Sequence, residues 1–133
     1  MNKNVPDMTS SRPYLVRAVY DWIVANNLTP YVLVDAENKA SVVPVEHVNN
    51  GKIVLNISPA AVRILEIGDE QLQFETRFSG KPMTVIAPIQ AVLAIYAKEN
   101  GRGMVFTEEG DGGKPPPEPT RIKTKKPNLR VVK

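Results

Sequence analysis

The sequence predicts an α+β domain that is mainly β, with an N-terminal helix, a bent antiparallel sheet or open barrel, a second short helix and a disordered C-terminal tail. Three observations support this fold class. Apolar side chains recur at helical spacing over residues 13–26. Several short β-type runs follow, separated by turn residues, as in small open barrels. From residue 107 onward the chain is rich in Gly, Pro and charge, a composition that buries no core.

The first helix is predicted over residues 13–26, after a polar segment, 1–11, that we expect to be disordered. Pro13 suits the first helical turn, with Ser10 or Ser11 near the cap. This helix is apolar on more than one side, so it has more than one face to cover. Either one small core covers both sides, or the helix meets its copy about a two-fold axis in a dimer. The two sides consist of Leu15, Val19, Trp22 and Ile23, and of Val16, Tyr20 and Val24.

A series of short strands is predicted after this helix, because β-branched and aromatic residues cluster between turn residues. Asn50-Gly51 and Ser79-Gly80 are hairpin-type turn pairs. Pro44 favours an edge position for its strand, since proline donates no ladder hydrogen bond. The predicted strands are 31–35, 41–45, 52–57, 70–78 and 82–87.

Three further elements are predicted from cap and turn residues. Ser58-Pro59 opens a short helical turn, because serine caps and proline suits the first helical position. The second helix is predicted over residues 88–99, starting with Pro88 and stopping at Gly101. Residues 103–106 form a last extended piece.

Charge is distributed unevenly along the chain. Of 17 Lys and Arg residues, six lie in residues 121–133, which contain none of the 14 Asp and Glu residues. The rest of the chain therefore has 11 basic and 14 acidic residues, a net charge of −3. A globular domain that binds nucleic acid carries a basic face. The charge pattern therefore indicates a basic tail on a mildly acidic domain, which disfavours nucleic-acid binding.

The residues that most enzymes use are scarce. The chain has no cysteine and one histidine, His47, which lies in no nucleophile motif. GDGGK, at residues 110–114, lacks the spacing of a phosphate-binding loop and is followed by proline. We therefore expect no enzymatic activity, no cofactor and no metal site. The sequence shows no signal peptide and no apolar run of about 20 residues, so we expect a cytoplasmic protein that does not enter a membrane.

Three stretches carry a resemblance to a known family. SRPYLVRAVYDWIVANNLTPYVLVDA, KIVLNISPAAV and VLAIYAKENGRGMVF resemble the stringent starvation protein B (SspB) family. The ending LRVVK resembles that family's terminal motif. Together these matches cover most of residues 11–106 and the last five residues.

The resemblance implies an adaptor of the ClpXP protease with an Sm-like domain that dimerises largely through its N-terminal helix. Such a domain binds the ssrA tag, a peptide added to nascent chains during ribosome rescue, and the terminal motif docks on the zinc-containing N-terminal domain of ClpX. The implied partners are ssrA-tagged proteins, ClpX, a second copy and the ribosome, in a stress response. The chain then divides into the disordered residues 1–11, a tag-binding and dimerisation domain, 12–106, a flexible linker, 107–127, and a docking peptide, 128–133.

The resemblance also implies site residues. Thr76 stands where the family often has alanine, so its side chain would narrow the groove or add a hydrogen bond. The tag-binding residues are Asn56, Ile57, Phe74, Thr76, Phe78 and Met104. The ClpX-docking residues are Leu129, Arg130, Val131, Val132 and Lys133. The dimer-interface residues are Tyr14, Leu15, Val16, Val19, Tyr20 and Ile23.

Alternatives to these assignments remain. Each apolar site residue can instead belong to the core of the domain. The main alternative function is an Sm-like RNA-binding module with a basic tail, because Sm-like barrels often bind RNA.

A flexible arm from residue 107 to 128 has an r.m.s. reach of about 26 Å, which gives a docked adaptor an effective concentration in the millimolar range.

Overall fold

The computed structural model describes residues 6–106, so the predicted linker and docking peptide lie outside the described residues. The described part has one α-helix, seven strands and two short 3-10 helices. In chain order these are α1 (Arg12–Ala25), β1 (Pro30–Asp35), η1 (Val45–His47), β2 (Lys52–Asn56), β3 (Arg63–Ile67), β4 (Gln71–Phe78), β5 (Lys81–Pro88), η2 (Ile89–Ala91), β6 (Val92–Ala97) and β7 (Gly103–Val105).

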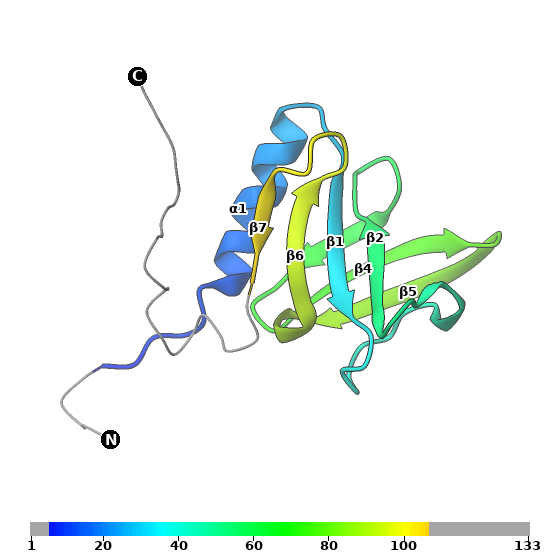
Figure 1. Ribbon diagram of the computed structural model, residues 1–133, viewed down its shortest axis with the longest axis horizontal. Helices are drawn as coiled ribbons and strands as arrows, with labels where there is room; N and C mark the ends of the chain where they lie inside the picture. Colours follow the sequence, from blue (N-terminus) through cyan, green and yellow to red (C-terminus); the bar gives the residue numbers. More distant parts are fainter. Residues whose placement is uncertain (1–5, 107–133) are drawn as a thin grey trace.

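The strands form two antiparallel sheets that do not close into a barrel. One sheet has the order β2-β1-β6-β7 and the other the order β3-β4-β5. In Figure 1 the long strands β4 and β5 run across the direction of β1, β2 and β6. The core lies between α1 and the two sheets, and its largest fully buried apolar side chain is Phe74. The predicted class, mainly β with an N-terminal helix and an open antiparallel architecture, is confirmed.

Helix α1 covers the first sheet and forms where the sequence predicted it. Pro13 lies in its first turn, and the backbone enters through Ser11 at the N-cap. Val16, Val19 and Ile23 are buried, and their spacing places them on one face of the helix. The helix ends at Asn26, and Asn27 takes a left-handed backbone with φ +62°, a conformation that asparagine tolerates better than most residues.

The predicted second helix over residues 88–99 is wrong. The chain instead forms the single turn η2 and then β6, which pairs with β1 on one side and β7 on the other. A strand in this position is covered by α1 on one face and by the rest of the core on the other, so it is apolar on both faces. A short apolar run of this kind fits a buried strand as well as a helix, and pairing with two neighbours decides for the strand.

One predicted strand is also absent, and one strand was not predicted. Over residues 41–45 only Val42 makes a β-bridge, exchanging hydrogen bonds of 2.7 and 3.0 Å with Ile86, before the chain turns into η1. The predicted strand at 41–45 is therefore wrong. Strand β3 was not predicted, because a bulge after Arg63, with Ile64 at φ +54°, breaks the alternation of side chains.

The predicted turns are confirmed. Asn50-Gly51 and Ser79-Gly80 all have positive φ angles between 55° and 80°, as a two-residue hairpin turn requires. The N–H groups of Ala61 and Val62 both donate to the carbonyl of Ser58, which closes the predicted helical turn.

Candidate peptide-binding groove

A groove lies between the edge strand β2 and the inner face of β4. Its volume is about 380 Å³, within the range of sites that hold a few side chains of a ligand. Most of its lining is apolar or aromatic, with two polar side chains, Asn56 and Thr76, and one cation. The lining residues are Tyr31, Val54, Leu55, Asn56, Ala61, Phe74, Thr76, Arg77 and Phe78.

The groove owes its aromatic wall to the alternation of β4. Phe74, Thr76 and Phe78 lie two residues apart and therefore point to the same face of the sheet. Phe74 is buried, whereas Thr76 and Phe78 are half-buried. Across the groove, the ring of Tyr31 is held edge to face against Tyr96, with centroids 6.0 Å apart. These packed rings give the groove walls of defined shape before any ligand binds.

Two hydrogen bonds shape the end of the groove near residues 56–61. The Ser58 N–H donates to Oδ1 of Asn56 at 2.9 Å, so the Nδ2 group is the donor that Asn56 can offer to a ligand. The Thr76 hydroxyl donates to the carbonyl of Ala61 at 3.1 Å. Thr76 thus ties β4 to the turn after β2, and both residues line the groove.

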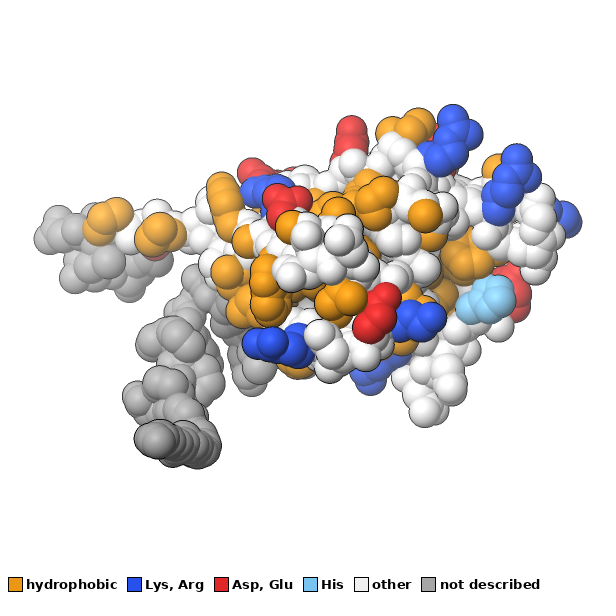
Figure 2. All heavy atoms as spheres, turned by 90° about the horizontal axis from the view of Figure 1, so that it is seen from above, with side chains coloured by type: hydrophobic (Ala, Val, Ile, Leu, Met, Phe, Trp, Pro, Cys, Tyr) orange, Lys and Arg blue, Asp and Glu red, His pale blue; other side chains and the backbone are white. Residues whose placement is uncertain are grey.

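At the other end of the wall, His47 packs against the Phe78 ring with centroids 5.5 Å apart. Arg77 donates to the carbonyl of Gly80 at 3.1 Å, which holds its guanidinium near the β4–β5 turn. Figure 2 shows one face of the molecule, on which Lys and Arg side chains are spread among hydrophobic and acidic ones and form no single basic patch.

Four of the six predicted tag-binding residues come together in this groove. Asn56, Phe74, Thr76 and Phe78 line it, although they come from two strands in different sheets. Ile57 is fully buried in the core, directly after β2. Met104 lies on β7, at the opposite edge of the sheet from β2, and packs against the core. The structure therefore does not bring Ile57 or Met104 to the groove.

Several lining residues were not among the sequence-based candidates. Val54 could have been found from the alternation of β2, because it lies between two buried residues and so faces the other way. Tyr31, Ala61 and Arg77 carry no comparable pattern. Tyr31 reaches the groove through the pairing of β1 with β2, and Ala61 through the turn that Thr76 holds. Arg77 lies on β4 itself.

The predicted dimer-interface residues differ in how far they are buried within the domain. Val16, Val19 and Ile23 are buried in the domain's own core, so they offer no surface to a second subunit. Leu15 and Tyr20 are partly buried against the same core. Tyr14 is 54% exposed, and Trp22, farther along α1, is 46% exposed with Arg102 stacked 5.6 Å from its ring centroid. A helix-mediated dimer stays a prediction, and it would use the outer face of α1.

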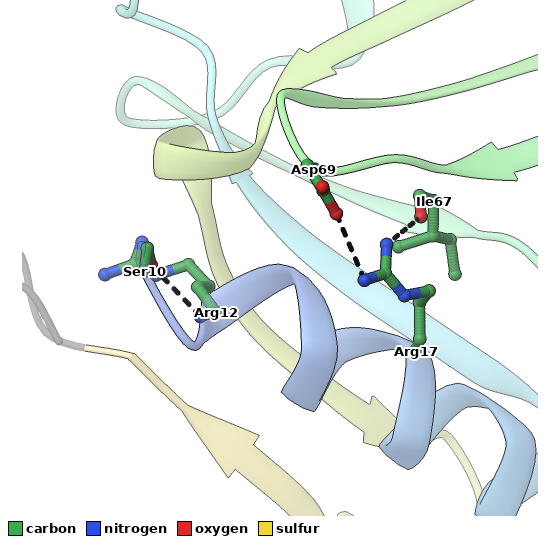
Figure 3. Close-up of polar contacts among 5 residues, drawn as sticks. All are labelled: Ser10, Arg12, Arg17, Ile67 and Asp69. Atoms are coloured by element: carbon green, nitrogen blue, oxygen red, sulfur yellow. Dashed lines mark hydrogen bonds and ion pairs between the residues drawn. The ribbon is translucent and has the colours of Figure 1, made fainter. Parts of the chain in front are cut away.

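That outer face is held in place by arginines on the inner side of α1 (Figure 3). Arg17 donates to the carbonyl of Ile67 at 2.7 Å and pairs with Asp69 at 3.1 Å, which links the helix to the second sheet. Arg12 is fully buried and donates to the carbonyls of Gln90 and Val92, each at 3.1 Å. Its backbone N–H donates to the Ser10 hydroxyl at 3.0 Å.

Within residues 6–106, no three His, Asp or Glu side chains gather as metal ligands would. None of the helices in the described range has the length and apolar character needed to span a membrane.

Burial raises the pKa of Tyr20, and nearby Asp21 adds to this shift. Hydrogen bonds from the Thr29 backbone and hydroxyl lower the pKa of Glu99. Both groups lie outside the groove lining.

The fold and the groove define a small β-rich binding domain in which an apolar groove runs beside the edge of an open sheet. Residues 10–133 match the family described as Stringent starvation protein B. The chain is also 49% identical over 98 residues to the "Stringent starvation protein B homolog" of Haemophilus influenzae, an alignment that covers 74% of this chain and 65% of that relative. The chain therefore belongs to the stringent starvation protein B family.

Proposed function

We propose that the protein is a cytoplasmic proteolysis adaptor, which binds the ssrA tag in the groove between β2 and β4 and delivers tagged polypeptides to ClpXP. The observation that carries this proposal is that four predicted tag-binding residues, from two sheets, line one groove. The groove has the apolar floor and few polar groups that suit an extended peptide. Family membership supports the same role.

The delivery step rests on the C-terminal arm. Residues 128–133 are proposed to dock on the N-terminal zinc-binding domain of ClpX, with Leu129 and Val132 as the apolar anchors. The adaptor performs no chemistry in this scheme. Docking turns the encounter between substrate and unfoldase into an intramolecular event, which raises the effective substrate concentration into the millimolar range. Two arms on a homodimer would add avidity.

The first test is fluorescence anisotropy of a labelled ssrA peptide, titrated with the full-length protein and with a truncation to residues 1–113. Equal binding at micromolar or lower concentration by both proteins is expected, because the groove lies wholly within residues 6–106. Absence of binding by either protein would remove the tag from the proposal. The same titration with a labelled single-stranded RNA tests the alternative of an RNA-binding module, which predicts a strong dependence on salt.

The second test separates the arm from the groove. The double variant Leu129→Ala with Val132→Ala is expected to bind the ssrA peptide like the wild type while losing adaptor-enhanced degradation of a tagged substrate by ClpXP. Equal loss of peptide binding would contradict the division of labour between arm and domain. The matched control is Ile122→Ala, which removes an apolar side chain from the linker, outside the docking peptide, and should keep both peptide binding and delivery.

A further inference from the structure

The segment between β1 and β2 carries a hollow that is separate from the groove between β2 and β4. Its volume is about 600 Å³, and the two hollows share no lining residue. Most of its lining is aliphatic, and two of its valines are well exposed, Val42 at 46% and Val45 at 77%. Exposed apolar residues that gather in one place mark an interaction site. We call this lining the valine surface; its aliphatic members are Ala36, Val42, Val43, Val45 and Val48.

Main-chain hydrogen bonds hold the valine surface in shape. Val42 exchanges bonds of 2.7 and 3.0 Å with Ile86 in β5, which fixes the segment to the second sheet. The Val48 N–H donates to the carbonyl of Val45 at 3.1 Å and closes the turn of η1. A surface that is already ordered loses little conformational freedom when it binds a partner. The valine surface is therefore preformed for binding.

The valine surface has one charged group, the carboxylate of Glu37. This side chain lies against Gly51, so closely that a Cβ at that position would collide with it. No Lys or Arg within residues 6–106 pairs with Glu37, since the ion pair in that range joins Arg17 to Asp69. An aliphatic surface with one unneutralised carboxylate is complementary to a segment that combines aliphatic and basic side chains.

The end of this chain has that composition. Residues 128–133, NLRVVK, contain three aliphatic side chains, two basic ones and no acidic one. Leu129, Val131 and Val132 supply the apolar groups, and Arg130 and Lys133 supply the positive charge. The segment therefore matches the valine surface in both of its properties.

The strand order brings the start of the arm and the valine surface to the same end of the sheet. Strands β1 and β7 both pair antiparallel with β6, so they run in the same direction (Figure 1). Leu33 and Val105 both pair with Ala94, which places them two strand spacings apart, or about 10 Å. The valine surface begins at Ala36, about 10 Å farther along β1. An arm with a reach of about 26 Å covers this distance.

We propose that residues 128–133 bind the valine surface of the protein's own domain, with aliphatic side chains in the hollow and a basic side chain against Glu37. These residues are also the proposed docking peptide for ClpX. The contact would therefore hold the adaptor in a closed state until ClpX competes for the peptide. This regulatory consequence rests on the proposed function, whereas the contact itself does not.

Paramagnetic NMR of the full-length protein tests the contact. Because the chain has no native cysteine, Thr124→Cys accepts a single nitroxide label five residues before Leu129. Spectra with the label oxidised and then reduced show which backbone amides it approaches. We expect the amide signals of Val42, Val45 and Val48 to lose more than half of their intensity in the oxidised state. No loss there, or a loss centred on another part of the domain, would overturn the proposal.

Two substitutions in the labelled protein, each with a matched control, test how the segment is recognised. Val45→Ser and Glu37→Lys should each restore at least half of the intensity lost at the other valines. The controls are Val105→Ser, at a valine on β7 that is 80% exposed, and Glu66→Lys, at an exposed glutamate on β3. Both controls should restore little. Equal restoration by a variant and its control would indicate unspecific attraction and overturn the proposal.

Addition of the ClpX N-terminal domain separates this proposal from the proposed function. If that domain captures residues 128–133, the lost intensity should return as it is added. Broadening that the domain does not relieve would support the contact and refute the docking on ClpX. Binding of the domain without prior broadening would do the reverse. If Val45→Ser lowers the sedimentation coefficient and the label broadens no valine signal, a second copy covers the valine surface and the proposal is overturned.

Discussion

Ile64 is the position at which one substitution should make the domain more stable. It has a left-handed backbone with φ +54°, within the bulge of β3, and its side chain is 63% exposed. The left-handed conformation costs about 1–2 kcal/mol for a residue with a Cβ and is a clear outlier for a β-branched one. Asparagine tolerates this conformation, so Ile64→Asn should recover most of that cost.

The Ile64→Asn variant also loses apolar contact, which lowers the free energy of unfolding and opposes this gain. Full burial of an isoleucine stabilises by about 1.5–3 kcal/mol, and only about a third of this side chain is covered. The loss is therefore about 0.5–1 kcal/mol, and the net gain is about 0.5–1 kcal/mol. For a domain of this size, such a gain raises Tm by about 2–6 °C.

The assay is thermal and urea unfolding of the wild type, Ile64→Asn and Ile64→Ala, followed by circular dichroism. Ile64→Ala is the matched control, because alanine removes the same apolar contact but gains little tolerance of positive φ. The expected order of the free energy of unfolding is Asn variant, wild type, Ala variant. If the asparagine variant is destabilised as much as the alanine variant, the backbone strain assigned to Ile64 does not exist.

Three further changes address the groove, a carboxylate and the helix surface. Thr76→Gln should fill the groove and weaken ssrA-peptide binding at least tenfold in anisotropy titrations, and unchanged affinity would place the site elsewhere. Glu99 should titrate below its ordinary value near 4.5 by NMR, because Thr29 stabilises its charged form. Since the folded pKa is the lower one, its contribution is present above pH 4.5 and is lost as pH falls through the folded pKa. Thr29→Val should therefore destabilise more at pH 7 than at pH 3. Tyr14→Arg should shift the protein toward the monomer in sedimentation experiments without lowering Tm by more than a few degrees, because Tyr14 lies on the exposed face of α1.

Sequence patterns correctly predicted the elements whose structure depends on residues close together in the chain. The helix around Val16, the two turn pairs and the alternating wall of Phe74, Thr76 and Phe78 each follow from spacing within one element. The groove residues on β4 could be named because side-chain alternation fixes the face that they share.

Features that depend on contacts distant in the chain could not be predicted in the same way. Residues 92–97 are apolar enough for a helix, and only their position between β1 and β7 makes them a strand. The open edge of β2 depends on the order of strands in the sheet, which its own five residues do not encode. Burial of Ile57 and the distance of Met104 from the groove likewise follow from topology, so the family resemblance alone placed both residues at the site.

Phe106, the last described residue, is anchored in the domain, and in the proposed adaptor this anchoring has a mechanical consequence. Under the proposed function, tension in the C-terminal arm would enter the domain at Phe106. The Phe106 ring is buried with the Arg12 guanidinium 5.0 Å from its centroid, and the Phe106 N–H donates to the carbonyl of Leu93. The Arg12 guanidinium also donates to the carbonyls of Gln90 in η2 and Val92 in β6. The force on Phe106 would therefore be shared with these elements and would not act on the three-residue β7 alone. The groove adjoins β2, at the opposite edge of the sheet. In the proposed adaptor, the bound peptide and the point where the arm pulls would therefore lie at opposite edges of the sheet, so strain at one edge need not distort the groove at the other.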